Sequence, residues 1–156
     1  MPEVYLWALF WIVFCALGAP ARSLASRPHA LFGALTVLLV ASITLLYALL
    51  WAPLRTVAAE EFAAGLILLV AGQGLMLSAR AALRGLTVWQ VLFELSEVRV
   101  RTGPYRLLSH PMYEGLTIAL AGSALMAGAP TWGSLVLCAW ILPIILLRVW
   151  IESRGG

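Results

Sequence analysis

Residues 115–147 read GLTIALAGSALMAGAPTWGSLVLCAWILPIILL and carry no charged side chain. A membrane-spanning helix needs about 20 apolar residues, with a range of about 17–25. The stretch is therefore too long for one span and too short for two full spans with a loop between them. Its middle, residues 128–133, reads GAPTWG, which is a cluster of turn-forming residues. We expect a tight helical hairpin with arms near residues 113–127 and 132–151, kinked at Pro143 in the second arm.

Three further uncharged blocks precede this hairpin, over residues 4–21, 30–54 and 62–79, and each is long enough for one span. The whole chain is 63% hydrophobic and only 11% charged, with a mean hydropathy of +0.98. Soluble domains carry about 25% charged residues. The sequence therefore predicts an all-α integral membrane bundle of about five transmembrane helices, organised as a single domain over residues 1–156.

The charged residues indicate how such a bundle is oriented. All basic side chains are Arg and all acidic ones are Glu, and the net charge is +3. With the N-terminus outside, nine of the ten Arg lie in cytoplasmic segments, and Arg55 alone lies outside. Arg-rich loops remain on the cytoplasmic side. We therefore expect an integral membrane protein, embedded in a lipid bilayer, with its N-terminus outside and its C-terminus in the cytoplasm.

Several classes of protein are disfavoured by the same composition. A nucleic-acid-binding protein would need a basic stripe, and the Arg residues are confined to short segments. A disordered chain would be far less apolar. Cys15 and Cys138 lie inside apolar runs without the spacing of metal ligands, so we interpret them as buried hydrophobic residues and predict no metal site.

The connection between the third and fourth spans, residues 80–114, is long for so small a protein. Residues 86–95 within it are rich in apolar side chains. This composition favours an interfacial or re-entrant helix under the bundle, with Trp89 at the level of the headgroups. A plain amphipathic linker helix is the alternative.

A cluster of site candidates follows in residues 103–115, which read GPYRLLSHPMYEG. The Gly-Pro pair predicts a turn, and a helix should begin at Pro111, which disfavours helix at the residue before it. His110 then lies at a helix N-terminus, where the helix dipole favours an anionic group, and Tyr105 and Tyr113 flank it. His110 is either a structural hydrogen-bonding residue or part of a binding site.

Arg148 and Glu152 lie one helical turn apart at the end of the last span. They could form an exposed ion pair at a helix end, or Arg148 could extend towards the interface. Ionisable groups at membrane depth usually point into the bundle and mark function. The hairpin returns Glu152 to the level of His110, so both side chains could face one pocket.

Taken together, these residues resemble the membrane methyltransferase superfamily that includes isoprenylcysteine carboxyl methyltransferases and phospholipid N-methyltransferases. Its pattern is G-P-Y-x-x-x-R-H-P-x-Y-x-G, then a hairpin, then R-x-x-E-E or similar. Ser109 replaces the Arg before His-Pro, and Ser153 replaces the second Glu. The C-terminal part of the chain matches well, whereas the first three spans match only in number and length.

The resemblance implies that the chain is an S-adenosylmethionine-dependent methyltransferase, with the cofactor motif in residues 80–115. By position, Arg148 would face the methyl acceptor, and His110 would be the base for an amine or thiol acceptor. The implied cofactor-binding residues are Gln90, Tyr105, His110, Pro111, Met112, Tyr113 and Glu152. A sulfonium cation is stabilised beside aromatic faces and carboxylates, which several of these residues supply.

The identity of the lipid-soluble methyl acceptor stays open at this point: an isoprenylcysteine carboxylate, a lipid amine, a thiol or another apolar metabolite. The alternative function is that of a non-catalytic subunit, built on the same scaffold, with a membrane-protein partner. A small transporter is disfavoured, because no charged residue lies at the centre of a span and no inverted repeat is visible.

Overall fold

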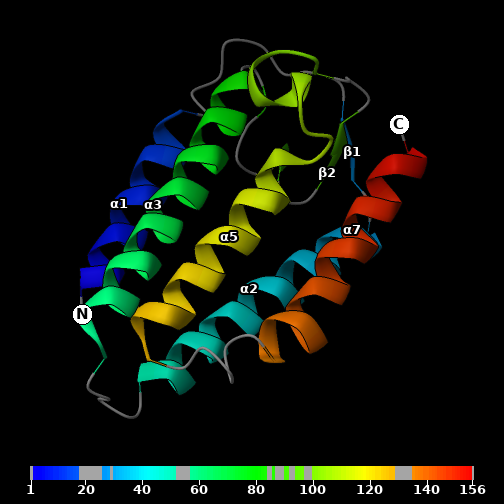
Figure 1. The fold of residues 1–156 in the computed structure, drawn as a ribbon. Helices are drawn as coiled ribbons and strands as arrows, with labels where there is room; N and C mark the ends of the chain where they lie inside the picture. Colours follow the sequence, from blue (N-terminus) through cyan, green and yellow to red (C-terminus); the bar gives the residue numbers. More distant parts are fainter. Residues whose placement is uncertain are drawn as a thin grey trace.

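The computed structural model describes residues 2–17, 26–28, 30–51, 57–83, 86, 90–91, 94–96, 100–128 and 135–155. In this part of the chain the fold is a bundle of five α-helices (Figure 1). They are α1 (Pro2–Ala16), α2 (Ala30–Trp51), α3 (Ala59–Ala82), α5 (Pro111–Met126) and α7 (Leu142–Gly155). The helices fall on the four uncharged blocks of the sequence, and the last block contributes both α5 and α7.

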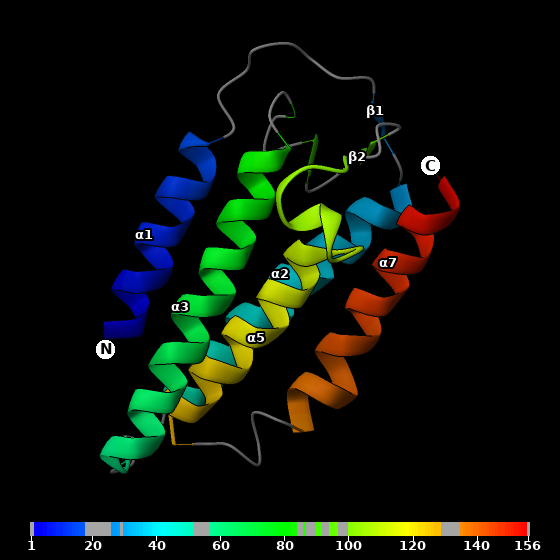
Figure 2. The same cartoon turned by 45° about the horizontal axis from the view of Figure 1, so that its top comes forward.

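The two ends of the bundle differ in content. The C-terminal end of α3, the start of α5 and the end of α7 lie together at one end, which we call the motif end (Figures 1 and 2). The N-terminus of α1 and the start of α3 lie towards the other end. Of the hairpin turn predicted for residues 128–133, Gly128 is described and has φ 65°, and the rest lies outside the described residues.

Glycines bring α3 and α5 into direct backbone contact, and this is the most extensive contact between two elements of the bundle. Gly72 lies against Gly115, and Gly65 lies against Gly122. A Cβ built on Gly72 would lie 2.4 Å from the Gly115 carbonyl oxygen and 2.5 Å from the Ala119 nitrogen. Small residues at such spacing let helices approach closely and gain dispersion contacts along their length. The pair α3–α5 is therefore the rigid centre on which the other helices pack.

An apolar core joins the remaining helices to this pair. Its fully buried aromatic residues, Phe14 and Phe32, come from α1 and α2, and they pack with Met76 and Leu120. An indole adds a polar contact between two of the helices. Trp7 Nε1 donates to Ser123 Oγ at 3.3 Å, which joins α1 to α5.

Helix α7 is preceded by a π-helical turn, η2 (Leu137–Ile141), in which Leu142 N–H donates to the carbonyl of Leu137. Pro143 follows directly, and proline cannot donate a backbone hydrogen bond to the preceding turn. A wider π turn is one way in which a helix accommodates such a break. The irregularity predicted at Pro143 is therefore a change of helical repeat just before this residue.

A short antiparallel pair of strands is an addition to the predicted all-α fold. Strand β1 (Ser26–Pro28) pairs with β2 (Glu94–Ser96), with Arg27 opposite Leu95. The helix predicted over residues 86–95 is therefore wrong at its end, although Gln90 and Val91 are helical. Residues 93–96 alternate apolar and polar side chains, which is typical of a strand. The helix prediction rests on the apolar content of the whole segment and gives this short alternation too little weight. Trp89 lies outside the described residues.

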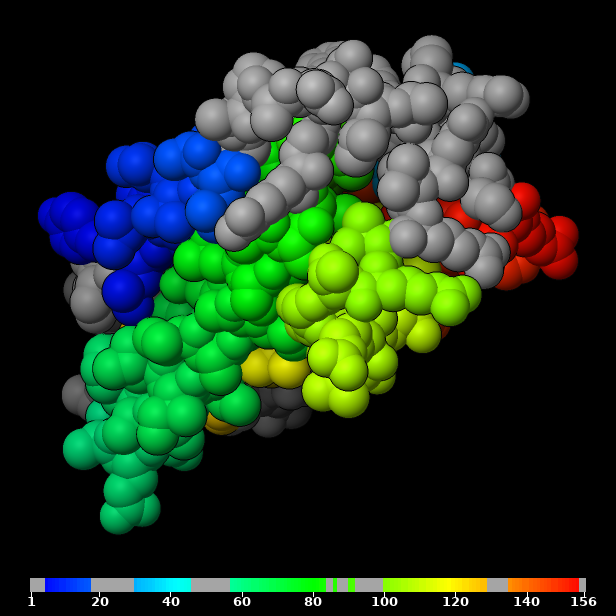
Figure 3. Space-filling model, turned by 90° about the horizontal axis from the view of Figure 1, so that it is seen from above, coloured from blue at the N-terminus to red at the C-terminus, as the bar shows by residue number. Residues whose placement is uncertain are grey.

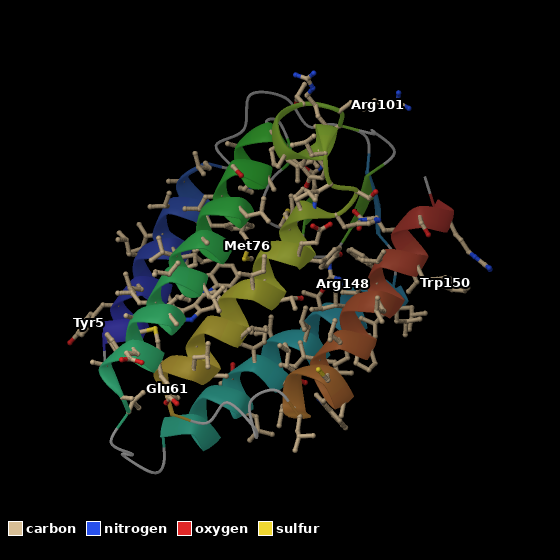
Figure 4. The ribbon with its side chains drawn as sticks, viewed as in Figure 1. Tyr5, Glu61, Met76, Arg101, Arg148 and Trp150 are labelled. Carbon is tan, nitrogen blue, oxygen red and sulfur yellow. The ribbon has the colours of Figure 1, made fainter. Side chains whose placement is uncertain are left out.

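Among the described residues, α3 is the one helix that is both long enough and apolar enough to cross a membrane. The apolar helical segments Tyr5–Ala16 and Ala30–Leu45 are shorter. Large apolar side chains nevertheless cover the outside of several helices, including Ile12, Val37, Ile67 and Leu146. Figure 4 shows Tyr5 and Trp150 pointing away from the bundle, whereas Met76 and Arg148 lie inside it.

Candidate functional site

The turn that begins the motif is set by its Gly-Pro pair. Gly103 has φ +58°, a left-handed conformation that glycine adopts without strain, and it begins the 3₁₀ helix η1 (Gly103–Arg106), with Pro104 in the first turn. The amides of Leu107 and Leu108 both donate to the Pro104 carbonyl, at 3.1 Å and 3.0 Å. In the view from above, η1 lies between the end of α3 and α7 (Figure 3). This closed turn carries Tyr105 to the inside of the motif end.

This turn gives a test of the backbone conformation. We expect Gly103→Ala to lower the free energy of unfolding by about 1 kcal/mol, because L-residues are strained in the left-handed region. Asn adopts that region more readily, so Gly103→Asn should lose less. Denaturant unfolding in a mild detergent measures both. An equal loss from both variants would instead assign the cost to crowding of the new Cβ against Ala82, 3.3 Å away.

The start of α5 confirms the local structure predicted around His110. The helix begins at Pro111, and His110 is its N-terminal cap residue, with an extended φ of −138°. The amides of Tyr113 and Glu114 donate to the His110 carbonyl at 3.0 Å and 3.2 Å. Proline suits the first helical position, because its missing N–H would have no partner there. The His110 ring is thereby held at the mouth of a helix N-terminus.

A cavity of about 480 Å³ opens next to this helix start. Elements α1, α2 and α3 give it a largely apolar wall, and η1, α5 and α7 give it a polar one. The predicted site residues that line it are Gln90, Tyr105, His110, Met112, Tyr113, Arg148 and Glu152. Pro111 is not part of the wall, since it is fully buried in the first turn of α5. Ser109 and Ser153, which replace charged residues of the pattern, also line the cavity.

His110 and Glu152 lie next to each other in the wall of this cavity, although 41 residues separate them in sequence. Their Nδ1 and Oε2 atoms lie 3.5 Å apart. The Oε2 atom is buried and, within the described part of the chain, accepts no hydrogen bond. A buried carboxylate oxygen without a donor is costly, and a ligand that brings a donor relieves the cost.

Tyr105 lines the same cavity as Glu152 and is influenced by its charge. Burial raises the pKa of its phenol well above the ordinary value of 10.0, and the Glu152 carboxylate raises it further. The hydroxyl therefore stays protonated at physiological pH and can donate a hydrogen bond. Its aromatic ring also lines the cavity, and aromatic rings suit a cationic ligand.

Arg148 is buried, with 3% of its surface exposed, and is held from three sides. Its Nε donates to the Tyr113 hydroxyl at 3.1 Å, and its Nη1 donates to Thr36 Oγ1. The guanidinium carbon lies 4.0 Å from the centre of the Phe32 ring. The Tyr113 hydroxyl also interacts with Glu152. A polar chain thus runs from Thr36 on α2, through α7 and α5, to the His110–Glu152 pair.

Sequence reasoning missed two kinds of residue at this end of the bundle. Thr36 and Phe32 were counted as part of an apolar span, and the only signal was a hydroxyl residue within an uncharged block. Arg80 was counted as a loop residue, but it is fully buried at the end of α3. Its Nη2 donates to the Leu86 carbonyl at 2.8 Å, and its guanidinium faces the Phe14 ring. Arg80 therefore holds Leu86, which follows α3 and lines the cavity, in place.

A mostly apolar cavity at one end of a helical bundle, walled in part by a carboxylate, a histidine and two tyrosines, is typical of small-molecule sites. Residues 61–154 match the model of the phospholipid methyltransferase family. The match covers more than half of the chain, so the protein belongs to that family, and the resemblance seen in the motif is confirmed. No curated protein and no solved structure matches the chain.

The family match covers α3, η1, α5 and α7, and with them most of the polar wall of the cavity. Helices α1 and α2 lie before it. Members of this family are methyltransferases of membrane substrates, and they generally use S-adenosylmethionine.

Proposed function

We propose that the protein transfers the methyl group of S-adenosylmethionine to a lipid-soluble acceptor, with both reactants bound in the cavity at the motif end. The observation that carries the proposal is the Glu152 carboxylate, whose buried Oε2 atom accepts no hydrogen bond from the described residues and lies 3.5 Å from His110 Nδ1, in a cavity whose polar wall comes mostly from the family-matched segment. The acceptor is an isoprenylcysteine carboxylate, a lipid amine or a thiol. The family match favours the lipid amine as the first to be tested.

The residues present suit this cofactor. The cavity volume of about 480 Å³ lies within the range of about 300–1,000 Å³ that is common for small-molecule sites. Glu152 would accept hydrogen bonds from the ammonium group or ribose hydroxyls of the cofactor. Tyr105, His110, Met112 and Tyr113 would line the pocket around it, with Gln90 at its edge. Pro111 would act indirectly, by starting the helix that carries this lining.

When bound, S-adenosylmethionine supplies a methyl group on a positively charged sulfur. The task of the protein is then to position the nucleophile in line and to exclude water, which accounts for most of such a rate gain. Arg148 would hold a carboxylate acceptor by paired hydrogen bonds. With an amine or thiol, His110 would take up the proton that the acceptor loses, and Glu152 would stabilise the resulting imidazolium.

The apolar wall supports delivery of the acceptor from a bilayer. Trp11 on α1 and Val40 on α2 line the cavity and are also exposed on the outside of the bundle. An acceptor dissolved in lipid could therefore enter between α1 and α2, while the cofactor would enter at the motif end. This proposal includes five membrane spans, with the N-terminus outside and the motif end in the cytoplasm. Figure 4 shows Arg101 at the motif end, and an Arg at this end supports its placement in the cytoplasm under the positive-inside rule.

The test uses the purified protein in mild detergent. Calorimetry should show saturable binding of S-adenosylmethionine, and tritium from its methyl group should appear in vesicles of phosphatidylethanolamine or in a farnesylated cysteine. The physical reason is that the cavity offers the Glu152 carboxylate to accept hydrogen bonds from the cofactor, and an apolar wall to contact the lipid. Absence of binding at millimolar cofactor would exclude catalysis and support the non-catalytic subunit. If the cofactor bound but no methyl group reached either acceptor, the proposed cofactor site would stand and both acceptors would be excluded.

A further inference from the structure

Helix α2 makes a specific contact with Arg148, the residue proposed to hold the methyl acceptor. Thr36 Oγ1 accepts a hydrogen bond from Nη1, and the Phe32 ring, one turn earlier, lies under the guanidinium at 4.0 Å. Tyr113 accepts from Nε at 3.1 Å. The guanidinium is therefore held at one edge by α2, at another by α5, and on one face by an aromatic ring. Such a set of contacts fixes the plane of the group as well as its position.

The polarity of the Thr36 hydroxyl is fixed by its other hydrogen bond. Thr36 Oγ1 donates its proton to the Phe32 carbonyl at 3.1 Å, within the same helix. A hydroxyl has one proton and two lone pairs, so the oxygen presents a lone pair to Arg148. The side chain is 2% exposed and also lines the cavity. It is thus an oriented acceptor built into the cavity wall rather than a surface hydroxyl.

A second polar contact between α2 and the last helical arm provides a contrast. Trp140 Nε1 donates to Ser42 Oγ at 2.8 Å. Ser42 Oγ in turn donates to the Leu38 carbonyl at 2.7 Å, so its hydroxyl is oriented in the same way as that of Thr36. Ser42 is not among the residues that line the cavity, and its hydroxyl accepts from Trp140 rather than from Arg148. If both contacts served only to hold helices together, removal of either hydroxyl would have a similar effect on the protein.

We propose that Thr36 is a positioning residue, which together with Phe32 sets the orientation in which Arg148 meets the methyl acceptor. Helix α2, which lies outside the family-matched residues 61–154, is then part of the acceptor site. The role of Arg148 towards the acceptor rests on the proposed function. The orientation of Arg148 by Thr36 does not, and it can be measured without cofactor or acceptor.

The first measurement reads Arg148 directly in the full chain in detergent micelles. Its Nε–Hε signal in ¹⁵N-arginine spectra is identified by its loss in Arg148→Lys. In Thr36→Val, which keeps the shape and loses the acceptor, we expect the signal to shift and its hydrogen exchange to accelerate about tenfold. Thr36→Ser, which restores the hydroxyl, and Ser42→Ala should both resemble the wild type. A wild-type spectrum in Thr36→Val, or an equal change in Ser42→Ala, would overturn the proposal.

The second measurement separates acceptor from cofactor. With the acceptor that the wild type methylates, Thr36→Val should lower kcat/KM for the acceptor about tenfold and leave the Kd for S-adenosylmethionine within about twofold. Thr36→Ser should recover most of the rate. Equal losses for acceptor and cofactor would contradict a role through Arg148. A wild type without any methyl transfer would contradict the proposed function, while the spectra would still decide the role of Thr36.

Discussion

Glu152→Gln is expected to weaken S-adenosylmethionine binding about 30-fold, because a hydrogen bond to a charged group contributes about 1.5–3 kcal/mol. The buried Oε2 atom lies in the cavity wall 3.5 Å from His110 Nδ1 and, among the described residues, accepts no hydrogen bond. Glutamine keeps the shape and removes the negative charge that would attract the ammonium and sulfonium groups. The loss should appear in the Kd from calorimetry.

A matched control for this substitution lies on α5. Glu114 is in the first turn of that helix, is exposed, and does not line the cavity. Glu114→Gln makes the same change of charge at the same end of the bundle, and its effect on the Kd should be less than about twofold, since exposed charges are well screened. If Glu152→Gln bound the cofactor as tightly as the wild type, the cofactor site would have to lie elsewhere.

The second large effect is expected from Gly72→Ala, which should destabilise the fold by about 3 kcal/mol. The new methyl group would lie 2.4 Å and 2.5 Å from backbone atoms of α5, and backbone cannot move aside as a flexible side chain can. Helices α3 and α5 would have to separate along their length and lose dispersion contacts. Denaturant unfolding in detergent gives the change in the free energy of unfolding.

Gly74 provides the control for helix propensity in the same turns of α3. A Cβ there would meet no atom within 4 Å. Gly74→Ala should therefore be neutral or stabilise the helix by up to about 1 kcal/mol, because alanine has the higher helix propensity. Equal effects of the two substitutions would show that α3 and α5 are not in close contact at Gly72.

The parts of this fold that the sequence predicts well are those with a local cause. Charged residues and turn-forming residues bound the apolar blocks, so the five helices could be placed. Pro111 marks the start of α5, and the return of the last helical arm predicts that Glu152 lies near His110, as their 3.5 Å distance confirms. Each of these inferences depends on residues close in sequence or on the geometry of one hairpin.

The parts that could not be predicted depend on contacts between distant segments. Thr36 meets Arg148 across 112 positions of sequence, and no local pattern specifies that pair. The pairing of β1 with β2 likewise joins residues near 27 to residues near 95. The burial of Arg80 could not be predicted either, because its partners are backbone carbonyls and an aromatic ring, and no sequence motif specifies such contacts.

The π turn before α7 has a consequence for the angular phase of everything after it. One extra residue in a helix rotates the following side chains by about 100° around the axis, since an α-helix has about 3.6 residues per turn. The turn Leu137–Ile141 lies ahead of both Arg148 and Glu152, so it determines that these two side chains point to the interior. Without that extra residue, both side chains would be turned by about 100° from their present direction towards the cavity. The position of the charged groups in the cavity thus depends on the one extra residue of the π turn, which lies roughly two helical turns before Arg148.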